Sequence, residues 1–537
     1  MYEYENNDTI TRGNELPINR RTVLKTLGAT GAVGSIFGVA SAEDQRTEPP
    51  GSQKPFDVIE LSVVEILSAI IRERTTAREI TEQYLRRIEA FDEKINSILT
   101  VNPRATERAE ELDEAWSNGG LVGPLHGVPV ILKDNQNTED MLTTGGAVTL
   151  ADSQPSEDAF VVKRVREAGG VILAKANLHE LAFGGTTVSS LGGQTRNPYA
   201  LNRTPGGSSG GTGAAIAANM GAIGFGTDTV NSIVSPASAC NLVGLRPTVG
   251  LVSRAGTIPF SETHDMVGPT TRSVADAAHL LDIIVGFDPA DATTAEGVTH
   301  IPESYTNYLN PKGLENARIG VLRSVFGESE EVLAVTEDAI NDIQALGGET
   351  VEVDADIDVD ELIGSFFVGT FEFQELFNEY LDDLGPNAPV ETLEEFIEAN
   401  EFHPSIESLL LSAFEIESPT EEPEYFERLF RRSQFKQRLF EIMAEDDLDA
   451  FFYPHQRQLV AEISDDQLGR NGFLSSGTGF PSIAVPGGFS ERNIPVGVQF
   501  LCRPFEEPKL IELAFAYEQG TGHRRPPKGF GYSGKGR

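Results

Sequence analysis

Cysteine is nearly absent from this chain of 537 residues, which contains only two. Cys240 and Cys502 are too few for a disulfide framework or for a zinc site built from cysteines. The eight histidines show no H-x-x-x-H or comparable spacing of metal ligands. We therefore predict that the protein uses no metal and no other cofactor.

Positive charge is also scarce, with 42 Lys and Arg against 82 Asp and Glu and a net charge of −40 at pH 7. A surface this acidic repels nucleic acids and anionic membranes, so we expect neither as a partner. The charge favours a halophilic protein, because concentrated salt screens the repulsion over about 3 Å. An exported enzyme that is merely acidic is the alternative.

Long hydrophobic runs are missing after residue 42, where none reaches the ~20 residues of a membrane helix. Before that point, Arg20 and Arg21 precede a Gly- and Ala-rich stretch that ends in Ala40-Ser41-Ala42. This pattern predicts a twin-arginine export signal over residues 1–42. An amphipathic helix is the alternative, but the stretch has no polar face. We expect an extracellular or cell-surface protein with no stable membrane insertion once the signal is removed.

The remaining chain alternates short apolar runs with helical patterns. This alternation predicts the α/β class: a single large domain with a central mixed β-sheet flanked by helices. The predicted domain covers residues 57–528, between a polar linker (43–56) and a flexible tail (529–537). Expected strands are 128–132, 171–174, 222–226, 317–322, 349–353, 450–453 and 497–501, and expected helices are 61–72, 76–91, 104–116, 159–168, 273–285 and 331–346.

Residues 354–447 form a region that is helical in pattern, acidic and rich in phenylalanine. Its phenylalanines are candidates for lining a substrate pocket, because they offer large apolar surfaces. Ordinary packing between helices is the alternative for each of them.

The stretch from Gly206 to Pro247 carries the strongest chemical signal. It opens with GGSSGG, continues through a small-residue helix and a short strand to Thr227-Asp228-Thr229, and then reaches Ser232. Glycines let backbones approach closely, so the two turns around the helix can bring two hydroxyl groups together. A serine nucleophile needs a base and preorganised hydrogen-bond donors. This stretch contains no histidine, so the base must come from elsewhere.

Lys133 is the candidate base. It ends the apolar run in GVPVILKDN, residues 127–135, which predicts a buried strand. Desolvation at such a position lowers the pKa of a lysine and frees its lone pair. A strand-end lysine that extends to water is the alternative.

These three elements, in this order and spacing, resemble the amidase signature family, and the similarity extends from about Leu61 to Pro527. Further segments that carry it are KANLHELAFG at 175–184, GLRPTVGLVSRAGTIPFSETHDMVGPTTRSVADAA after the serines, and GFPSIAVPGGF near the end. The resemblance implies hydrolysis of a small-molecule amide by a Ser–cis-Ser–Lys triad. It implies Ser232 as nucleophile, Ser208 as bridging serine with a cis peptide, and Lys133 as base.

The same resemblance implies an oxyanion hole formed by the backbone N–H groups of Thr229, Val230, Asn231 and Ser232. The chain departs from the family at two places here. Val230-Asn231 replaces a common Gly-Gly, so we expect these side chains to crowd the hole and narrow the acyl pocket. Val234 replaces a common arginine two residues after the nucleophile, which removes a buried cation and puts the support of the serine loop in doubt.

Other interpretations remain open. Residues 206–210 also match the G-x-S-x-G nucleophile elbow, which would make Ser208 the nucleophile with His455 or His523 as base, although no strand is expected just before it. A phosphate-binding loop is disfavoured because Thr212 stands where a lysine is required.

The catalytic subunit of a tRNA-dependent transamidase and a catalytically impaired binding protein with the amidase fold are further alternatives. The oligomeric state is left open, with a homodimer as one option.

Overall fold

The computed structural model describes residues 56–353 and 355–531. The predicted export signal and all of the predicted linker but residue 56 lie outside the described residues, as do residues 532–537 of the predicted tail. Within the described part, no helix combines the length and the apolar character needed to cross a membrane.

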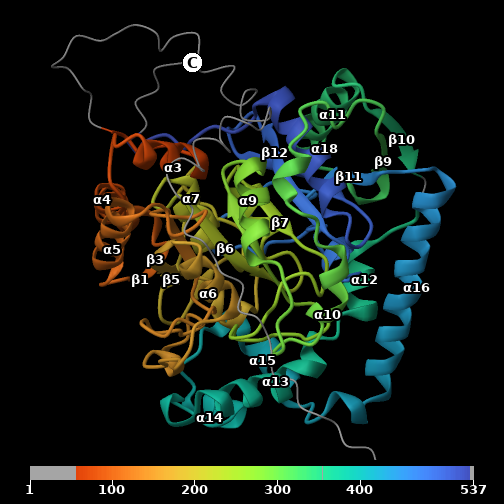
Figure 1. Ribbon diagram of the computed structural model, residues 1–537. Helices are drawn as coiled ribbons and strands as arrows, with labels where there is room; N and C mark the ends of the chain where they lie inside the picture. The colour runs from red at the N-terminus through yellow and green to blue at the C-terminus, as the bar shows by residue number, and fades with distance from the viewer. Residues whose placement is uncertain (1–55, 354, 532–537) are drawn as a thin grey trace, which may run out of the picture.

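The core is a single mixed sheet of eleven strands in the order β1-β3-β2-β6-β8-β7-β12-β13-β11-β9-β10, which confirms the predicted α/β class (Figure 1). The β2 strand pairs in parallel with β3 and β6, and the central strands β6, β8, β7, β12 and β13 pair antiparallel. The strands are β1 Ile98–Val101, β2 Pro129–Lys133, β3 Val171–Ala176, β6 Ile223–Asp228, β7 Val243–Arg246, β8 Met266–Thr271, β9 Arg318–Leu322, β10 Glu349–Val353, β11 Ala450–Pro454, β12 Ser482–Phe489 and β13 Pro495–Leu501; β4 Val188–Ser189 and β5 Gly193–Gln194 form a separate hairpin.

Sequence patterns missed β1, β7, β8 and β12. The β8 and β12 segments contain proline and glycine, which are depleted in strands, yet both strands are almost entirely buried. Their pairing with neighbours on both sides outweighs this local preference. By contrast, β9 and β10 were expected as strands, and they are the last two strands at one edge of the sheet.

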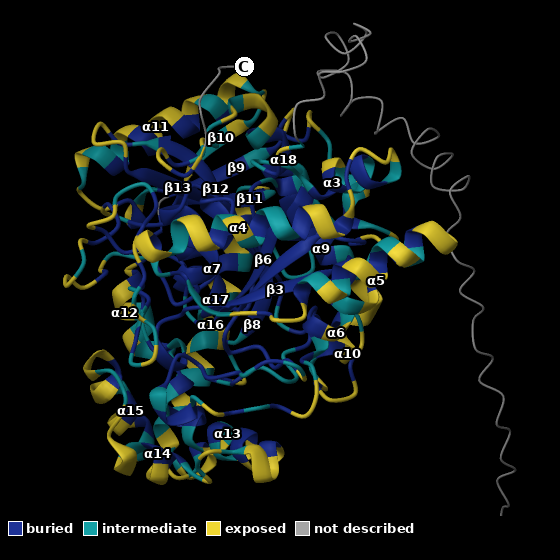
Figure 2. Cartoon of the chain, turned by 90° about the vertical axis from the view of Figure 1, so that its left-hand side faces the viewer, coloured by how far each residue is buried: buried dark blue, intermediate teal, exposed yellow. Residues whose placement is uncertain are grey.

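Helices surround the sheet, with buried inner faces and exposed outer faces (Figure 2). The α4 helix begins with the Thr76–Glu79 capping box and ends where Asn96 turns left-handed, so it runs past the predicted end at residue 91. The helices are α3 Val63–Ile71, α4 Ala77–Ile95, α5 Ala105–Asn118, α6 Phe160–Glu167, α7 Gly210–Ala217, α8 Val234–Ala239, α9 Val274–Ile284, α10 Thr294–Gly297, α11 Glu330–Ala345, α12 Val359–Phe366, α13 Gly369–Leu384, α14 Leu393–Ala399, α15 Glu407–Phe414, α16 Pro423–Glu445, α17 Phe473–Ser476 and α18 Glu507–Thr521.

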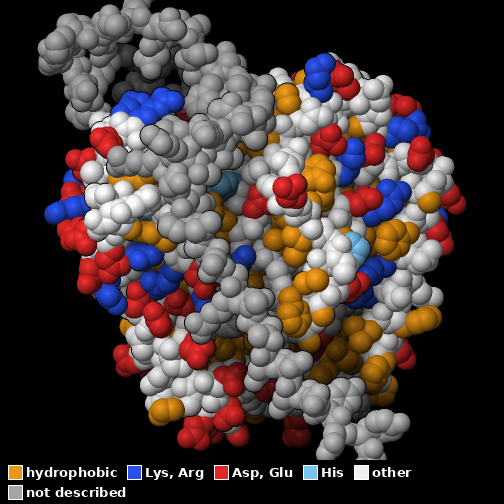
Figure 3. Space-filling model, viewed as in Figure 1, with side chains coloured by type: hydrophobic (Ala, Val, Ile, Leu, Met, Phe, Trp, Pro, Cys, Tyr) orange, Lys and Arg blue, Asp and Glu red, His pale blue; other side chains and the backbone are white. Residues whose placement is uncertain are grey.

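The helices α13 to α15 form a lobe at the bottom of Figure 1, which we call the helical lobe. Phe373 and Phe377 are fully buried there in a hydrophobic cluster that also contains Phe183 and Phe260 from the main body. Packing is therefore the role of these two phenylalanines, and not the lining of an open pocket. No Lys or Arg occurs between Arg323 and Arg428, and acidic side chains mark the lower edge of the molecule in Figure 3.

Candidate active site

Lys133 is the last residue of β2, an interior strand between β3 and β6. Its side chain is fully buried. Its Nζ atom lies 2.7 Å from the Ser208 Oγ and 2.7 Å from the Thr227 Oγ1, with the Thr227 carbonyl oxygen at 3.4 Å. The fold thus joins two of the predicted site residues by a direct hydrogen bond.

Burial lowers the pKa of Lys133 from its usual 10.5 to about 7. The carboxylates of Asp228 and Asp265 oppose this effect without cancelling it. In its neutral form the amine has two N–H groups, which can donate to the hydroxyl oxygen and the carbonyl oxygen of Thr227. Its lone pair is then left for the Ser208 proton.

Lys175 provides an internal contrast, because it is also a fully buried lysine close to Lys133 in the sheet. Its Nζ forms an ion pair with Asp134 at 3.2 Å and donates to Thr143 Oγ1 at 2.8 Å. Within the part of the chain that the structure describes, Lys133 has no such ion pair. Burial lowers the pKa of Lys175 as well, but the ion pair with Asp134 favours its charged form. Lys175 therefore has the environment of a structural cation, and Lys133 has that of a base.

A cis peptide bond links Gly207 to Ser208, as the family resemblance implies. The next residue, Ser209, ties the two serine segments together: its N–H donates to the Ser232 carbonyl at 3.3 Å, and its hydroxyl donates to the Thr227 carbonyl at 3.1 Å. Gly211 allows α7 to pack closely, since a Cβ atom there would lie 2.1 Å from the Asn177 carbonyl oxygen.

Ser232 lies between β6 and α8 and is 7% exposed. Among residues 56–353 and 355–531, its hydroxyl makes no hydrogen bond, either to Ser208 or to another group. The backbone N–H groups of residues 229–232 likewise donate to no group in this part of the chain. These residues therefore provide a free hydroxyl and a run of free N–H donors, as a nucleophile and its oxyanion hole require. The absence of a Ser208–Ser232 hydrogen bond is compatible with such a site, because catalytic hydrogen bonds commonly tighten only when substrate binds.

Residues 229–231 are held by contacts that the sequence did not reveal. Ser476 of α17 donates to the Val230 carbonyl at 2.7 Å, and Thr229 donates to Asp265 at 2.5 Å. The Asn231 side chain is buried, and its Oδ1 faces Arg470 rather than a protein backbone group. The sequence signals for these partners were two segments similar to the family: GLRPTVGLVSRAGTIPFSETHDMVGPTTRSVADAA, which contains Asp265, and GFPSIAVPGGF, which follows Ser476.

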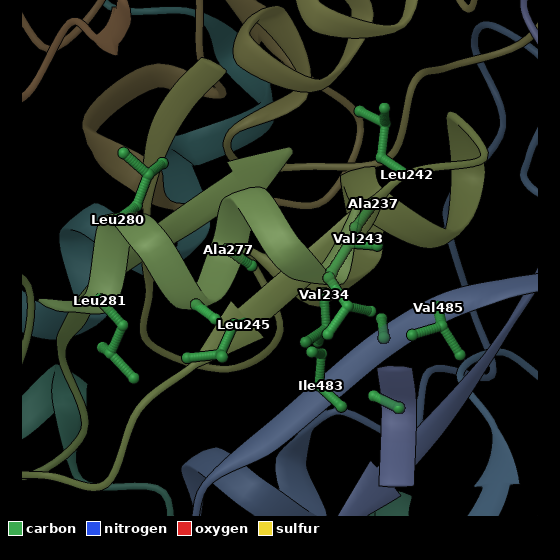
Figure 4. Close-up of a cluster of buried hydrophobic side chains, with 14 of the residues drawn as sticks. Val234, Ala237, Leu242, Val243, Leu245, Ala277, Leu280, Leu281, Ile483 and Val485 are labelled. Atoms are coloured by element: carbon green, nitrogen blue, oxygen red, sulfur yellow. The ribbon is translucent and has the colours of Figure 1, made fainter. Parts of the chain in front are cut away.

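The Val234 position shows that the serine loop keeps its support. Val234 is fully buried among Ala237, Val243 and Ile483 (Figure 4). A buried cation at the loop is supplied by Arg246 on β7, which pairs with Asp228 at 3.0 Å with both side chains fully buried. The other carboxylate oxygen of Asp228 accepts from the Ile233 N–H at 2.8 Å. The Asp228 carboxylate, paired with Arg246 and bonded to the Ile233 N–H, therefore holds the loop at both its ends.

The nucleophile-elbow interpretation finds no base for Ser208. His455 contacts Gln499 and His523 contacts Asp342, and neither bonds Ser208 within the described residues. No cluster of three or more His, Cys, Asp or Glu side chains suited to a metal occurs in that part of the chain.

Comparison with known proteins gives a consistent result. A family model described as amidase matches residues 79–511. The chain is 35% identical over 518 residues to a probable amidase of Arabidopsis thaliana, covering 92% of this chain and 95% of the plant protein. It is 36% identical over 486 residues to one subunit of the glutamyl-tRNA(Gln) amidotransferase of Moorella thermoacetica, covering 87% of this chain and 98% of that protein. The crystal structure of the peptide amidase of Stenotrophomonas maltophilia superposes with a TM-score of 0.81 at 35% identity, covering 88% of this chain and 99% of that one.

Proposed function

This chain belongs to the amidase signature family and is an amide-hydrolysing enzyme, and we propose that it acts through an acyl-enzyme on Ser232 with Ser208 as bridging serine and Lys133 as base. The observation that carries the proposal is the buried Lys133 amine, bonded to Ser208 and without a carboxylate partner in the described structure. A lysine in that state is neutral above about pH 7 and can accept a proton.

The proposed reaction has two halves. Neutral Lys133 takes the proton of Ser208 while Ser208 takes that of Ser232, and the Ser232 oxygen attacks the amide carbonyl. The free N–H groups of Thr229, Val230, Asn231 and Ser232 stabilise the negative oxygen that forms. The relay then protonates the leaving amine or ammonia as the C–N bond breaks. A water molecule attacks the ester by the same route and releases the carboxylic acid.

The rate should depend on pH through Lys133. Protonation below about pH 7 removes its lone pair, so we expect kcat/KM to rise about tenfold per pH unit up to that point and to level off above it. A pH profile from 5 to 9 on a non-ionising amide measures this. A flat profile, or one still rising at pH 9, would remove Lys133 from the base role.

Labelling of the nucleophile tests the site more directly. A fluorophosphonate probe should label wild-type Ser232, and the Lys133→Ala variant should label about 10²–10⁴-fold more slowly near neutral pH. Lys163→Ala, a change of an exposed lysine on α6, is the matched control and should label like wild type. Peptide mapping of the labelled protein identifies the serine. Undiminished labelling of Lys133→Ala contradicts the proposal.

The substrate class we propose is a carboxylic amide or a short peptide amide, supported by the likeness to a peptide amidase. The relatives also support a second candidate, the catalytic subunit of a tRNA-dependent transamidase. The net charge of −40 disfavours a polyanionic tRNA substrate. Copurification with partner subunits would favour the transamidase, whereas ammonia release from simple amides by the isolated chain would favour the amidase.

We also propose that the enzyme is exported and works in high salt. The Arg20-Arg21 pattern and the acidic composition support this proposal. Activity assays are therefore best made in concentrated salt. A folded protein that is silent on a panel of aliphatic, aryl and peptide amides would favour the binding-protein alternative.

A further inference from the structure

Arg470 lies beside both serine segments. Its Nη1 atom is 3.4 Å from Oδ1 of Asn231, the residue before Ser232. A Cβ atom on Gly185 would lie 1.9 Å from the same Nη1, so the guanidinium packs directly on the Gly185 backbone. Gly185 in turn packs on Gly207, where a Cβ atom would lie 2.8 Å from the Gly185 carbonyl carbon. The cation is thus seated next to the segments that carry Ser232 and Ser208.

Within residues 56–353 and 355–531, this guanidinium has no carboxylate partner. Other arginines near the serine segments are paired: Arg246 with Asp228, and Arg254 with Asp291. In the described part of the chain, the long contact to Asn231 is the one hydrogen bond of the Arg470 side chain. The side chain is half-buried, and its other N–H groups have no acceptor there and are not sealed from solvent. Asp360, whose negative charge acts on it, is already ion-paired with Arg457.

An unpaired arginine is unexpected in this setting, because Asp and Glu outnumber Lys and Arg by 82 to 42. A planar guanidinium with several free donors matches a carboxylate, which it can bind through two parallel hydrogen bonds. Resting on the proposed function, we infer that Arg470 binds a carboxylate of the substrate, so that the enzyme prefers amides carrying a carboxylate close to the scissile bond.

The acidic surface works against this preference at long range, because it repels anions on approach. At molar salt that repulsion is screened within about 3 Å, whereas a contact ion pair in a half-buried site is screened much less. The preference should therefore be measured in concentrated salt.

Two matched substrate pairs and one conservative variant test the inference. In the first pair, succinamate carries a carboxylate on the acyl side of the scissile bond, and butyramide is its neutral counterpart. In the second pair, acetylglycine carries a carboxylate on the amine side, and N-propylacetamide is its neutral counterpart. Wild type should favour the anionic member of one pair, and that pair identifies the side. Arg470→Gln should reduce the ratio of kcat/KM values, anionic over neutral, by about 10- to 100-fold, while Arg470→Lys should retain part of it.

The ratio separates recognition from structural support. If Arg470 only positions Asn231, Arg470→Gln lowers kcat/KM by the same factor for both substrates of a pair. The ratio of the two values is then unchanged, which overturns the inference. A wild type that hydrolyses both butyramide and N-propylacetamide at least as well as the matched acids also overturns it, with the proposed function intact. Failure of folded wild type to hydrolyse either pair counts against the proposed function itself and removes the basis of the inference.

Discussion

The Ser232→Ala variant should hydrolyse amides with a kcat about 10⁴- to 10⁶-fold below that of wild type. Without its nucleophile, the enzyme retains only substrate binding and oxyanion stabilisation. In the part of the chain that the structure describes, the Ser232 hydroxyl and the backbone N–H groups of residues 229–232 make no hydrogen bond. The substitution removes one oxygen from a nearly buried position and adds no bulk, so the fold should be retained. Ammonia release from a primary amide in concentrated salt measures the loss, with circular dichroism as the check on folding.

Ser235→Ala is the matched control for this variant. Ser235 lies three residues further along, in α8, and is also buried, but none of its side-chain contacts is needed for the proposed relay. We expect it to keep activity within about tenfold of wild type, since the change removes one hydroxyl group and leaves the backbone bond from the Ser235 N–H to the Asn231 carbonyl in place. Ser232→Ala protein that retains substantial activity would show that another group attacks the amide, and Ser208 would then be the first serine to examine.

Breaking the buried pair between Arg246 and Asp228 should have the largest effect on stability. Arg246→Met leaves the Asp228 carboxylate fully buried without its cation, and removal of one partner from such a pair costs about 3–5 kcal/mol. The variant also loses the donation from Arg246 to the His264 carbonyl at 2.6 Å. Urea unfolding, with the midpoint and slope compared to wild type at one salt concentration, measures the cost.

An exposed ion pair supplies the control. Arg492 and Glu331 form a surface pair, so Arg492→Met should cost less than about 1 kcal/mol. Adding Asp228→Asn to Arg246→Met should recover part of the stability, because the neutral amide can still accept from Ile233 and no charge is left unpaired. Equal unfolding midpoints for Arg246→Met and Arg492→Met would contradict the anchoring role given to the buried pair.

Local pattern was sufficient for elements whose residues carry their own signal. The apolar run before Lys133 predicted β2, and the helical pattern predicted a helix from residue 76, where the structure has the Thr76–Glu79 capping box. Elements without such a signal were missed. The β8 segment MVGPTT has weak strand propensity, and its pairing with β6 and β7 determines its conformation.

The sequence by itself determined the α/β class, the amidase resemblance and the identity of the candidate residues Lys133, Ser208 and Ser232, because these depend on composition, local periodicity and short motifs. Only the tertiary structure decided which buried lysine has the environment of a base. Lys133 and Lys175 both end up fully buried in neighbouring strands, yet Asp134 pairs with Lys175 alone.

Tertiary structure also brought Arg246 and Asp228 together as a buried ion pair at the serine loop, and it left Arg470, beside Asn231, without a carboxylate partner among the described residues. The physical reason is common to all three cases. Desolvation and ion pairing depend on which segments the fold brings together, and the partners of Ser208, Ser232 and Asn231 come from segments far away in the chain. A motif identifies a side chain, whereas its charge state and its partners follow from the packed surroundings.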